Sequence, residues 1–80
     1  MNKFLIDVRT SEEFNSGHRD GAINIPVEEI SDGKLGVITN IPKDTPIELY
    51  CLSGSRAGYA KLILGSLGYV DVVNGGGFSG

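Results

Sequence analysis

The chain contains a single cysteine, Cys51, at the point where an apolar segment gives way to a loop of small residues. Residues 47–50 precede it as a strand-like run, and residues 52–56 follow it and open a predicted helix. Thiolates at helix N-termini or beside arginine have pKa values of roughly 3.5–7.5, against roughly 8.5 for free cysteine. With Arg56 nearby, Cys51 is therefore a candidate nucleophile that is ionised at neutral pH.

The loop after the cysteine distinguishes this reactive interpretation from a structural one. A cysteine at the end of a core strand is often just a small buried hydrophobe. A purely structural cysteine, however, does not require Ser53, Gly54 and Ser55 at the N-terminus of the next helix. At this position, unpaired backbone N–H groups can point into one anion-binding bowl. The reactive interpretation is favoured, and it requires that the sulfur be reachable from solvent.

The overall composition is that of one folded domain spanning residues 1–80. Apolar residues make up 40% and charged residues 21% of the chain, which is ordinary for a globular protein. The net charge of -3 and the lack of a basic cluster argue against nucleic-acid binding. No apolar run approaches the roughly 20 residues that cross a bilayer, so no membrane association is expected.

The counts of cysteine and histidine limit the location and the cofactors. A single cysteine cannot form an internal disulfide, so the reducing cytoplasm is the simplest location. A periplasmic protein whose leader had been removed would carry the same sequence, and this alternative stays open. One cysteine and one histidine cannot supply the usual clustered ligands of a zinc site, so we expect no metal and no cofactor.

Strand-like and helix-like patterns alternate along the chain. Short apolar runs predict strands at residues 4–8, 21–26, 47–50 and 69–73, and helical signals lie at residues 11–16, at residues 27–30 and after the cysteine loop. Residues 31–46 carry mixed signals and predict only one irregular helical turn. This alternation predicts an α/β fold with a parallel sheet and right-handed crossovers.

Local patterns support these elements. Thr10 and Glu13 fit a capping box at the start of the first helix. The apolar residues of the helix after the cysteine fall at helical spacing and predict one core-facing stripe, made of Ala60, Ile63, Leu64 and Leu67. Gly68 predicts the end of that helix, and the glycines within residues 74–77 predict a turn after the last strand.

The carboxyl ends of the strands are expected to carry the site. Ligands of parallel α/β sheets bind beyond these ends. Residues 7–9, Cys51 and residues 74–77 all follow predicted strands. Three segments should therefore converge on one edge of the sheet, with the cysteine loop between the other two.

Six short motifs, in this order along nearly the whole chain, match a known family. They are residues 6–9 (IDVR), 13–14 (EF), 17–26 (GHRDGAINIP), 50–57 (YCLSGSRA), 68–69 (GY) and 75–78 (GGGF). The chain resembles a single-domain rhodanese, a sulfurtransferase, and is most similar to the small bacterial phage-shock-type thiosulfate sulfurtransferases. The resemblance implies a rhodanese-like three-layer α/β fold, with a small, mainly parallel central sheet flanked by helices, in a minimal or trimmed version.

The resemblance also implies a reaction. The Cys51 thiolate would attack the outer sulfur of thiosulfate, or of a persulfide donor, and carry that sulfur as a persulfide while sulfite leaves. A thiol, cyanide or a protein sulfur acceptor would then remove the sulfur, and the enzyme would act as a monomer. The side chain of Arg56 would hold the sulfonate of the donor, and backbone N–H groups would stabilise the persulfide. The implied substrate-binding residues are Leu52, Ser53, Gly54, Ser55, Arg56 and Ala57.

Loop length separates this prediction from a related chemistry. Related phosphatases and arsenate reductases place a longer segment between the cysteine and the arginine than residues 52–55 provide here. The smaller bowl suits a sulfur atom, so hydrolysis or reduction of an oxyanion is the weaker alternative. A non-catalytic sulfur carrier or a redox-sensing module acting through Cys51 is the stronger one. Ser53 and Ser55 are expected either to donate hydrogen bonds to the donor or simply to be small enough for the loop.

The remaining family positions are interpreted as structural. Asp7 and Arg9 are expected to cap and pair locally after the first strand, and His18 is expected to brace the turn formed by residues 17–21. Glu48 is unusual in a central strand, where an unpaired charge would be costly. It should therefore lie near the start of its strand or have a partner.

Overall fold

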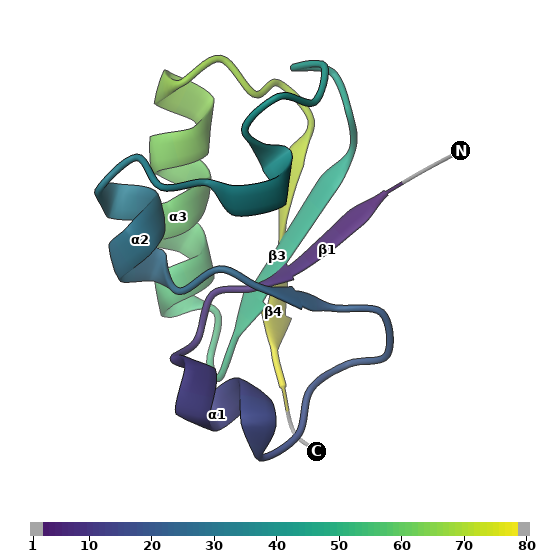
Figure 1. Ribbon diagram of the computed structural model, residues 1–80, viewed down its shortest axis with the longest axis vertical. Helices are drawn as coiled ribbons and strands as arrows, with labels where there is room; N and C mark the ends of the chain where they lie inside the picture. The colour runs from purple at the N-terminus through teal and green to yellow at the C-terminus, as the bar shows by residue number, and fades with distance from the viewer. Residues whose placement is uncertain (1–2, 79–80) are drawn as a thin grey trace.

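The computed structural model describes residues 3–78 as a twisted parallel sheet with helices beside it (Figure 1). The elements in chain order are β1 (Phe4–Asp7), α1 (Ser11–Asn15), β2 (Ile23–Asn24), α2 (Val27–Ser31), the 3-10 turn η1 (Gly36–Ile38), β3 (Ile47–Cys51), α3 (Ser55–Ser66) and β4 (Val72–Gly77). Each predicted element is present, although β2 is shorter than its sequence pattern indicates. Within residues 3–78, no helix has the length and apolar composition needed to span a bilayer.

The sheet has the strand order β2-β1-β3-β4, and every neighbouring pair is parallel. The predicted α/β class with a small parallel sheet is therefore confirmed. In the register, Ile6 of β1 lies between Ile23 of β2 and Leu49 of β3. Because all four strands run the same way, their carboxyl ends meet at one edge of the sheet, and α1 lies beyond that edge (Figure 1).

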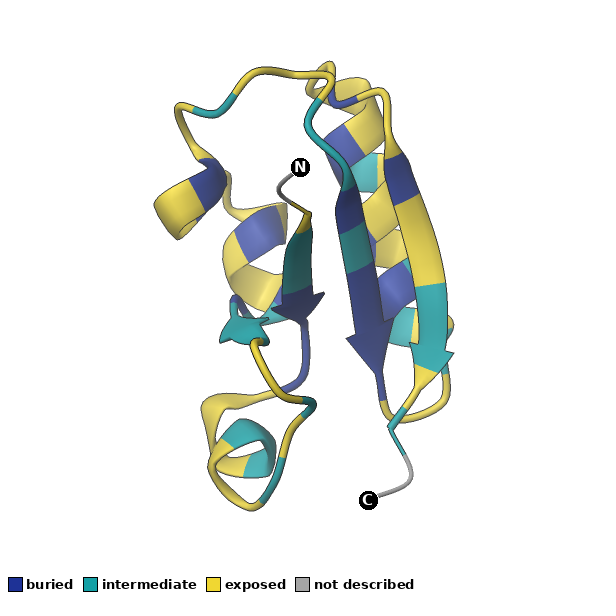
Figure 2. Cartoon of the chain, turned by 90° about the vertical axis from the view of Figure 1, so that its right-hand side faces the viewer, coloured by how far each residue is buried: buried dark blue, intermediate teal, exposed yellow. Residues whose placement is uncertain are grey.

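One face of the sheet forms the core with the helices. The side chains of Ile6, Ile47 and Leu49 belong to this core and are at most 1% exposed. Figure 2 shows the buried positions in dark blue along β1 and β3, with α2 and α3 behind the sheet. Ala60 and Leu64 of α3 complete the contact. Full burial of a side chain such as leucine or isoleucine stabilises a fold by roughly 1.5–3 kcal/mol. The sheet therefore packs against the helices through the face that carries these apolar side chains.

The end of α3 corrects one prediction. The expected apolar stripe holds at Ala60 and Leu64, which are buried, and at Ile63, which packs against the core. Leu67, by contrast, is 45% exposed. The reason is that Leu67 is the C-cap of α3, and Gly68 follows it with a φ of 101°, a left-handed conformation that glycine adopts without strain. The core-facing stripe of α3 therefore ends at Leu64, and Leu67 lies outside it.

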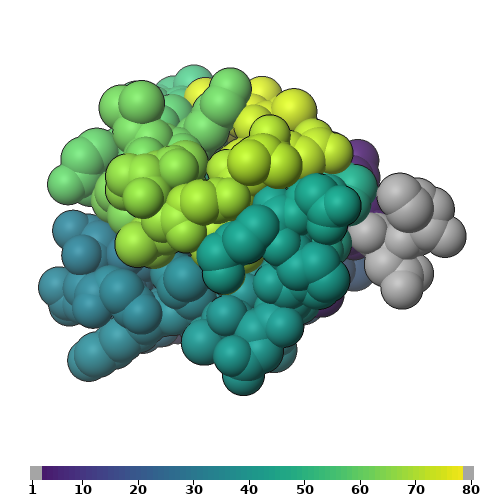
Figure 3. All heavy atoms as spheres, turned by 90° about the horizontal axis from the view of Figure 1, so that it is seen from above, coloured from purple at the N-terminus to yellow at the C-terminus, as the bar shows by residue number. Residues whose placement is uncertain are grey.

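The last strand also differs from its predicted bounds. Tyr69 is buried before the strand begins, and its hydroxyl donates to the carbonyl oxygen of Ile38. The Val70 N–H donates to the Lys43 carbonyl oxygen at 3.0 Å. These contacts hold residues 67–71 against the segment that precedes β3, at the end of the molecule seen in Figure 3. β4 therefore starts later than predicted and includes the glycines predicted as a turn, because β3 supplies partners for their backbone.

The other face of the sheet carries a polar network. Glu48 lies in the middle of the sheet but is paired with Lys3 at 2.7 Å and with Arg19 at 3.1 Å. The Arg19 guanidinium also lies 4.3 Å from the centre of the Tyr50 ring and donates to the Gly77 carbonyl oxygen at 2.9 Å. Glu48 thus has the partners that its position requires, and Arg19 joins β4 to the centre of the sheet.

Candidate functional site

Cys51 ends β3, and residues 52–54 lead from it into α3. Gly54 is the N-cap of α3 and has a φ of 97°, a left-handed conformation that favours glycine. The Gly54 N–H donates to the Cys51 sulfur at 2.9 Å, and the Ala57 N–H reaches the same atom at 3.4 Å. The sulfur thus lies at the N-terminal end of α3, where N–H groups lack partners within the helix.

These contacts shift the protonation of the thiol. Burial raises the pKa of Cys51, because a buried thiolate loses its hydration. Four backbone N–H groups lower it by more, so the pKa of the thiol lies below its ordinary value. They belong to Ala57, Ser53, Gly54 and Arg56. The direction of the shift is the one that the sequence predicts for a nucleophile.

The sulfur is less accessible than a nucleophilic role requires. Cys51 has no exposed surface and belongs to the core cluster. The expectation that it is reachable from solvent is therefore not met in this arrangement of the chain. The side chain instead belongs to the core cluster, and the sulfur lies against the Gly54 and Ala57 N–H groups at the start of α3. A donor can reach the sulfur only after neighbouring groups move.

Asn74 supports the cysteine loop from β4. Its side-chain Nδ2 donates to the Gly54 carbonyl oxygen at 2.9 Å, and its Oδ1 accepts from the Gly76 N–H at 2.9 Å. The amide thereby joins the glycine run to the residue whose N–H faces the sulfur. From the sequence, residues 74–77 are placed at this edge of the sheet, but Asn74 receives no role. The one available signal is a polar residue at the head of a glycine run.

The side chain of Arg56, which the resemblance implies holds the donor sulfonate, is paired with the carboxylate of Glu13. Its Nη1 donates to Glu13 Oε1 at 2.8 Å, and its Nη2 donates to Oε2 at 3.1 Å. Glu13 also completes the predicted capping box, because its Oε1 accepts from the Thr10 N–H at 3.0 Å. The hydrogen bonds from Arg56 and from the Thr10 backbone lower the pKa of Glu13 to about 2. Glu13 is thus part of the site, although its sequence pattern indicates only a helix cap.

The remaining predicted substrate-binding residues offer backbone groups more than side chains. The Leu52 side chain is largely exposed, whereas Ala57 is buried and faces the sulfur with its N–H. Ser53 and Ser55 are both exposed, and their hydroxyl oxygens lie 3.3 Å apart. The serines therefore have each other as hydrogen-bond partners, and both interpretations of them stay predictions.

A family model decides the identity of this arrangement. The model described as Rhodanese-like domain matches residues 1–80. The chain belongs to the rhodanese-like family. This confirms the resemblance carried by the six sequence motifs, including the segment around Cys51.

Proteins named as sulfurtransferases are among those similar to this rhodanese chain. It is 42% identical over 73 residues to the thiosulfate sulfurtransferase PspE of Escherichia coli, covering 90% of this chain and 67% of PspE. It is 40% identical over 75 residues to the uncharacterized protein YqhL of Bacillus subtilis, covering 92% of this chain but only 56% of that relative. A solved rhodanese with anions from E. coli matches with a TM-score of 0.82 at 37% identity, over 95% of this chain and 87% of that chain. The human single-domain sulfurtransferase TSTD1 matches with a TM-score of 0.81 at 26% identity, over 95% of this chain and 77% of that chain. The predicted rhodanese-type enzyme class is thereby confirmed.

In this rhodanese domain, Asp7 and Arg9 form a buried pair after β1. Arg9 Nη2 donates to Asp7 Oδ2 at 2.7 Å and to the Gly17 carbonyl oxygen at 2.7 Å. His18 stacks on Phe14 with ring centres 3.7 Å apart, and its Nδ1 lies 2.8 Å from the Phe14 carbonyl oxygen. These contacts agree with the local, structural roles predicted for Asp7, Arg9 and His18.

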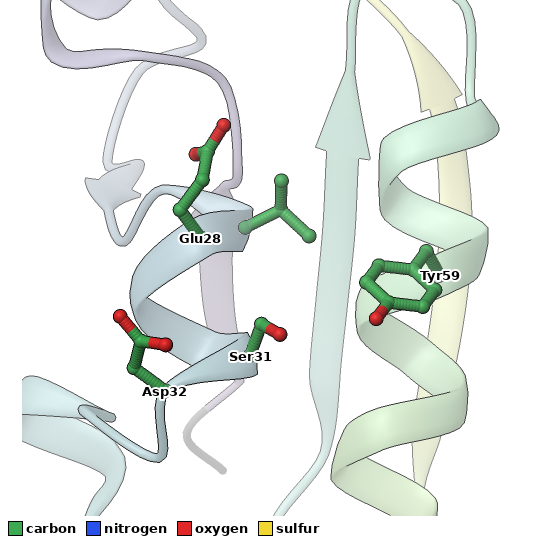
Figure 4. A pocket seen from close by; sticks show the side chains of 5 residues that line it. Glu28, Ser31, Asp32 and Tyr59 are labelled. Atoms are coloured by element: carbon green, nitrogen blue, oxygen red, sulfur yellow. The ribbon is translucent and has the colours of Figure 1, made fainter.

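A hollow of about 460 Å³ lies between α2 and α3 of the rhodanese domain (Figure 4). It is lined by Val27, Glu28, Ser31, Asp32 and Tyr59. Cys51 is not among these residues, so the hollow is separate from the loop that surrounds the sulfur. Among residues 3–78, no three histidine, cysteine or acidic residues gather closely enough to hold a metal ion.

Proposed function

We propose that this chain moves a sulfane sulfur from a donor to a thiophilic acceptor through a persulfide on Cys51. The observation that carries the proposal is the setting of the sulfur, which accepts the Gly54 N–H at 2.9 Å and has a pKa below its ordinary value. The names of the relatives PspE and TSTD1 support the same chemistry. The proposed donors are thiosulfate and small persulfides, and the proposed acceptors are cyanide, thiols and a protein thiol.

The proposed transfer has two half-reactions, loading of Cys51 and unloading to the acceptor, and each conserves atoms and charge. The Cys51 thiolate attacks the outer sulfur of thiosulfate, the S–S bond of thiosulfate breaks, and sulfite leaves with the electron pair. The cysteine persulfide anion remains. A lone pair of the acceptor then attacks the outer sulfur of the persulfide, and the Cys51 thiolate leaves, so that cyanide yields thiocyanate. The N–H groups that favour the thiolate would favour the persulfide anion in the same bowl.

The proposed substrate-binding segment acts mainly through its backbone. It consists of Leu52, Ser53, Gly54, Ser55, Arg56 and Ala57. We propose that its N–H groups hold the transferred sulfur, at a small reorganisation cost because the loop is already fixed. The hydrogen bond from Asn74 to the Gly54 carbonyl oxygen supports this preorganisation.

Intact-mass spectrometry tests the proposed function. Incubation with thiosulfate or with freshly generated cysteine persulfide should add one sulfur, about 32 Da, and cyanide should remove it. The Cys51→Ser variant should gain nothing while keeping the circular dichroism spectrum of the native chain. A wild-type chain that takes up sulfur from neither donor, or an adduct that persists in the serine variant, would overturn the proposal.

Alkylation of Cys51 is expected to show two opposing properties. Because the pKa of the thiol is lowered, the rate with iodoacetamide should rise with pH through a midpoint below the value of roughly 8.5 for free cysteine. Because the residue has no exposed surface, the plateau rate should be lower than that of glutathione. Mass spectrometry of quenched samples over a range of pH values measures both quantities. A midpoint at or above that of free cysteine would contradict the anion-stabilising bowl.

A sulfur carrier or redox-sensing module acting through Cys51 is a second candidate function. The complete burial of this residue favours it. Small acceptors would reach a buried sulfur slowly, whereas a partner protein that displaces the covering groups would reach it faster. Slow turnover with every small acceptor, combined with a stable complex with one cellular protein, would select this function over the first.

The compartment, the oligomeric state and the absence of a cofactor stay predictions. The single cysteine favours a reducing compartment, so we propose the cytoplasm, with the periplasm as the alternative. We also propose a monomer that needs no metal or cofactor. Size-exclusion chromatography with light scattering, followed by activity measurements in the presence of a chelator, tests both statements.

A further inference from the structure

The arginine expected to receive an anionic donor is already engaged. Its bidentate pair with Glu13 uses two N–H groups of the guanidinium, the geometry that makes arginine and carboxylate bind strongly. The side chains of Arg56 and Glu13 are 33% and 31% exposed, so the pair lies at the surface beside the cysteine loop. An incoming sulfonate must displace the Glu13 carboxylate or bind a guanidinium whose charge is already neutralised.

The groups around Arg56 are negative on balance. The pKa of Arg56 is raised by the hydrogen bond to Glu13 and also by the charges of Glu13, Cys51 and Glu28. Glu28 belongs to α2, where Figure 4 shows its side chain extending from the helix. Because the pKa of Glu13 is about 2, its carboxylate stays charged throughout the neutral range. Two carboxylates and one thiolate therefore act on a single guanidinium.

We infer that Glu13 selects the sulfur donor by charge, so that Cys51 takes sulfur readily from persulfides without a sulfonate and poorly from dianionic thiosulfate. This inference rests on the proposed sulfur transfer and narrows its donor class. Glu13 acts here as a specificity-determining residue that neutralises Arg56 and repels a second anionic group. The donor would bring only its outer sulfur into the bowl of N–H groups.

With cysteine persulfide as the donor, the leaving group carries less negative charge than sulfite. The Cys51 thiolate attacks the outer sulfur of cysteine persulfide, the S–S bond of the donor breaks, and cysteine thiolate leaves with the electron pair. The proton of the donor stays on the transferred sulfur. With thiosulfate, the same attack would gather the charges of the thiolate and of a dianion beside Glu13 and Glu28, and Coulomb repulsion would raise the barrier.

The Glu13→Gln variant tests the inference with little structural change. Glutamine keeps an oxygen that can accept from the Thr10 N–H, and its side chain can still accept from Arg56. The variant removes the negative charge, and its amide nitrogen replaces the oxygen that accepts from Arg56 Nη2, so one of the two hydrogen bonds to the guanidinium is lost. The second-order rate constant for loading Cys51 from thiosulfate is expected to rise by at least about tenfold, and that from cysteine persulfide to change by less than about twofold.

The Glu12→Gln variant is the matched control. Glu12 lies in the same first turn of α1, is exposed, and its replacement changes the net charge of the chain by the same amount. It should leave both rate constants within about twofold of the wild type, because salt screens an exposed charge at a distance. Sulfur uptake measured by mass spectrometry at several donor concentrations gives all of these constants.

Several outcomes would overturn the inference. Unchanged loading from thiosulfate in Glu13→Gln would show that Glu13 does not act on the donor. Equal gains for both donors would show a change in the thiol itself, which the midpoint of the alkylation profile would register. A gain of the same size in Glu12→Gln would indicate a general effect of net charge. A wild-type chain that loads from neither donor would instead remove the proposed function, so the two failures are distinguishable.

Discussion

The Arg9→Met variant is expected to destabilise the fold by about 3–5 kcal/mol, because it leaves the Asp7 carboxylate buried without its charged partner. The Arg9 and Asp7 side chains are only 5% and 0% exposed. Nε and Nη2 of Arg9 donate to the carboxylate over distances of 2.7 to 3.1 Å. After the substitution, the main-chain N–H of residue 9 would still donate to Asp7, but the charged partner would be gone. A domain of 80 residues has a total stability of about 4–12 kcal/mol, so much of the chain would unfold.

Urea unfolding followed by circular dichroism measures this loss. The double variant Asp7→Asn with Arg9→Met serves as the control, since it carries no unpaired charge and should lose less stability than Arg9→Met alone. A loss below about 1 kcal/mol for the single variant would show that the pair behaves like an exposed salt bridge. A double variant that is less stable than the single one would also contradict the argument.

The parts of the fold that sequence patterns predict are those fixed by neighbours along the chain. The capping box of Thr10 and Glu13 joins residues within one helical turn, and the structure contains it. The strand that ends at Cys51 and the helix that follows are likewise set by a short apolar run and a glycine at the N-cap. The convergence at the carboxyl edge of the sheet follows from parallel topology alone. These features need no knowledge of distant contacts.

The pairing of Arg56 with Glu13 could not be predicted in this way. The two residues are separated by 43 positions, and neither periodicity nor spacing relates them. From the resemblance, Arg56 belongs to the loop and is expected to hold the sulfonate of the donor. In the structure, α1 places the Glu13 carboxylate against the Arg56 guanidinium, a contact that the sequence motifs do not indicate.

The course of β4 is a second feature that local patterns do not predict. Asparagine and glycine are unfavourable in strands, so residues 74–77 predict a turn. In the structure the backbone of this segment pairs with β3 up to Cys51, with an irregularity between Leu49 and Cys51. The pairing of the sheet overrides the local propensity. A pattern along one strand cannot show which strand will pair with it.

The Gly77→Ala variant is expected to raise the pKa of the Cys51 thiol. A Cβ at residue 77 would lie 2.3 Å from the carbonyl oxygen of Leu52, and this oxygen belongs to the backbone, so no side-chain rotation can relieve the contact. Either the β4 backbone or the peptide between Leu52 and Ser53 must shift, and this peptide carries the Ser53 N–H, one of the groups that lower the thiol pKa. A rise of about one pKa unit corresponds to about 1.4 kcal/mol and would slow sulfur loading near neutral pH by up to about tenfold.

The Gly65→Ala variant is the matched control for this prediction. Gly65 lies in α3, and a Cβ there would meet no atom within 4 Å. This variant should keep the alkylation midpoint of the wild type and gain roughly 0.5–1 kcal/mol of stability, because alanine favours a helix over glycine. The Asn74→Ala variant adds no atoms but removes the support of Gly54, so it should shift the midpoint in the same direction as Gly77→Ala. Folded Gly77→Ala and Asn74→Ala variants with an unchanged midpoint would show that β4 does not hold the loop in its anion-binding form.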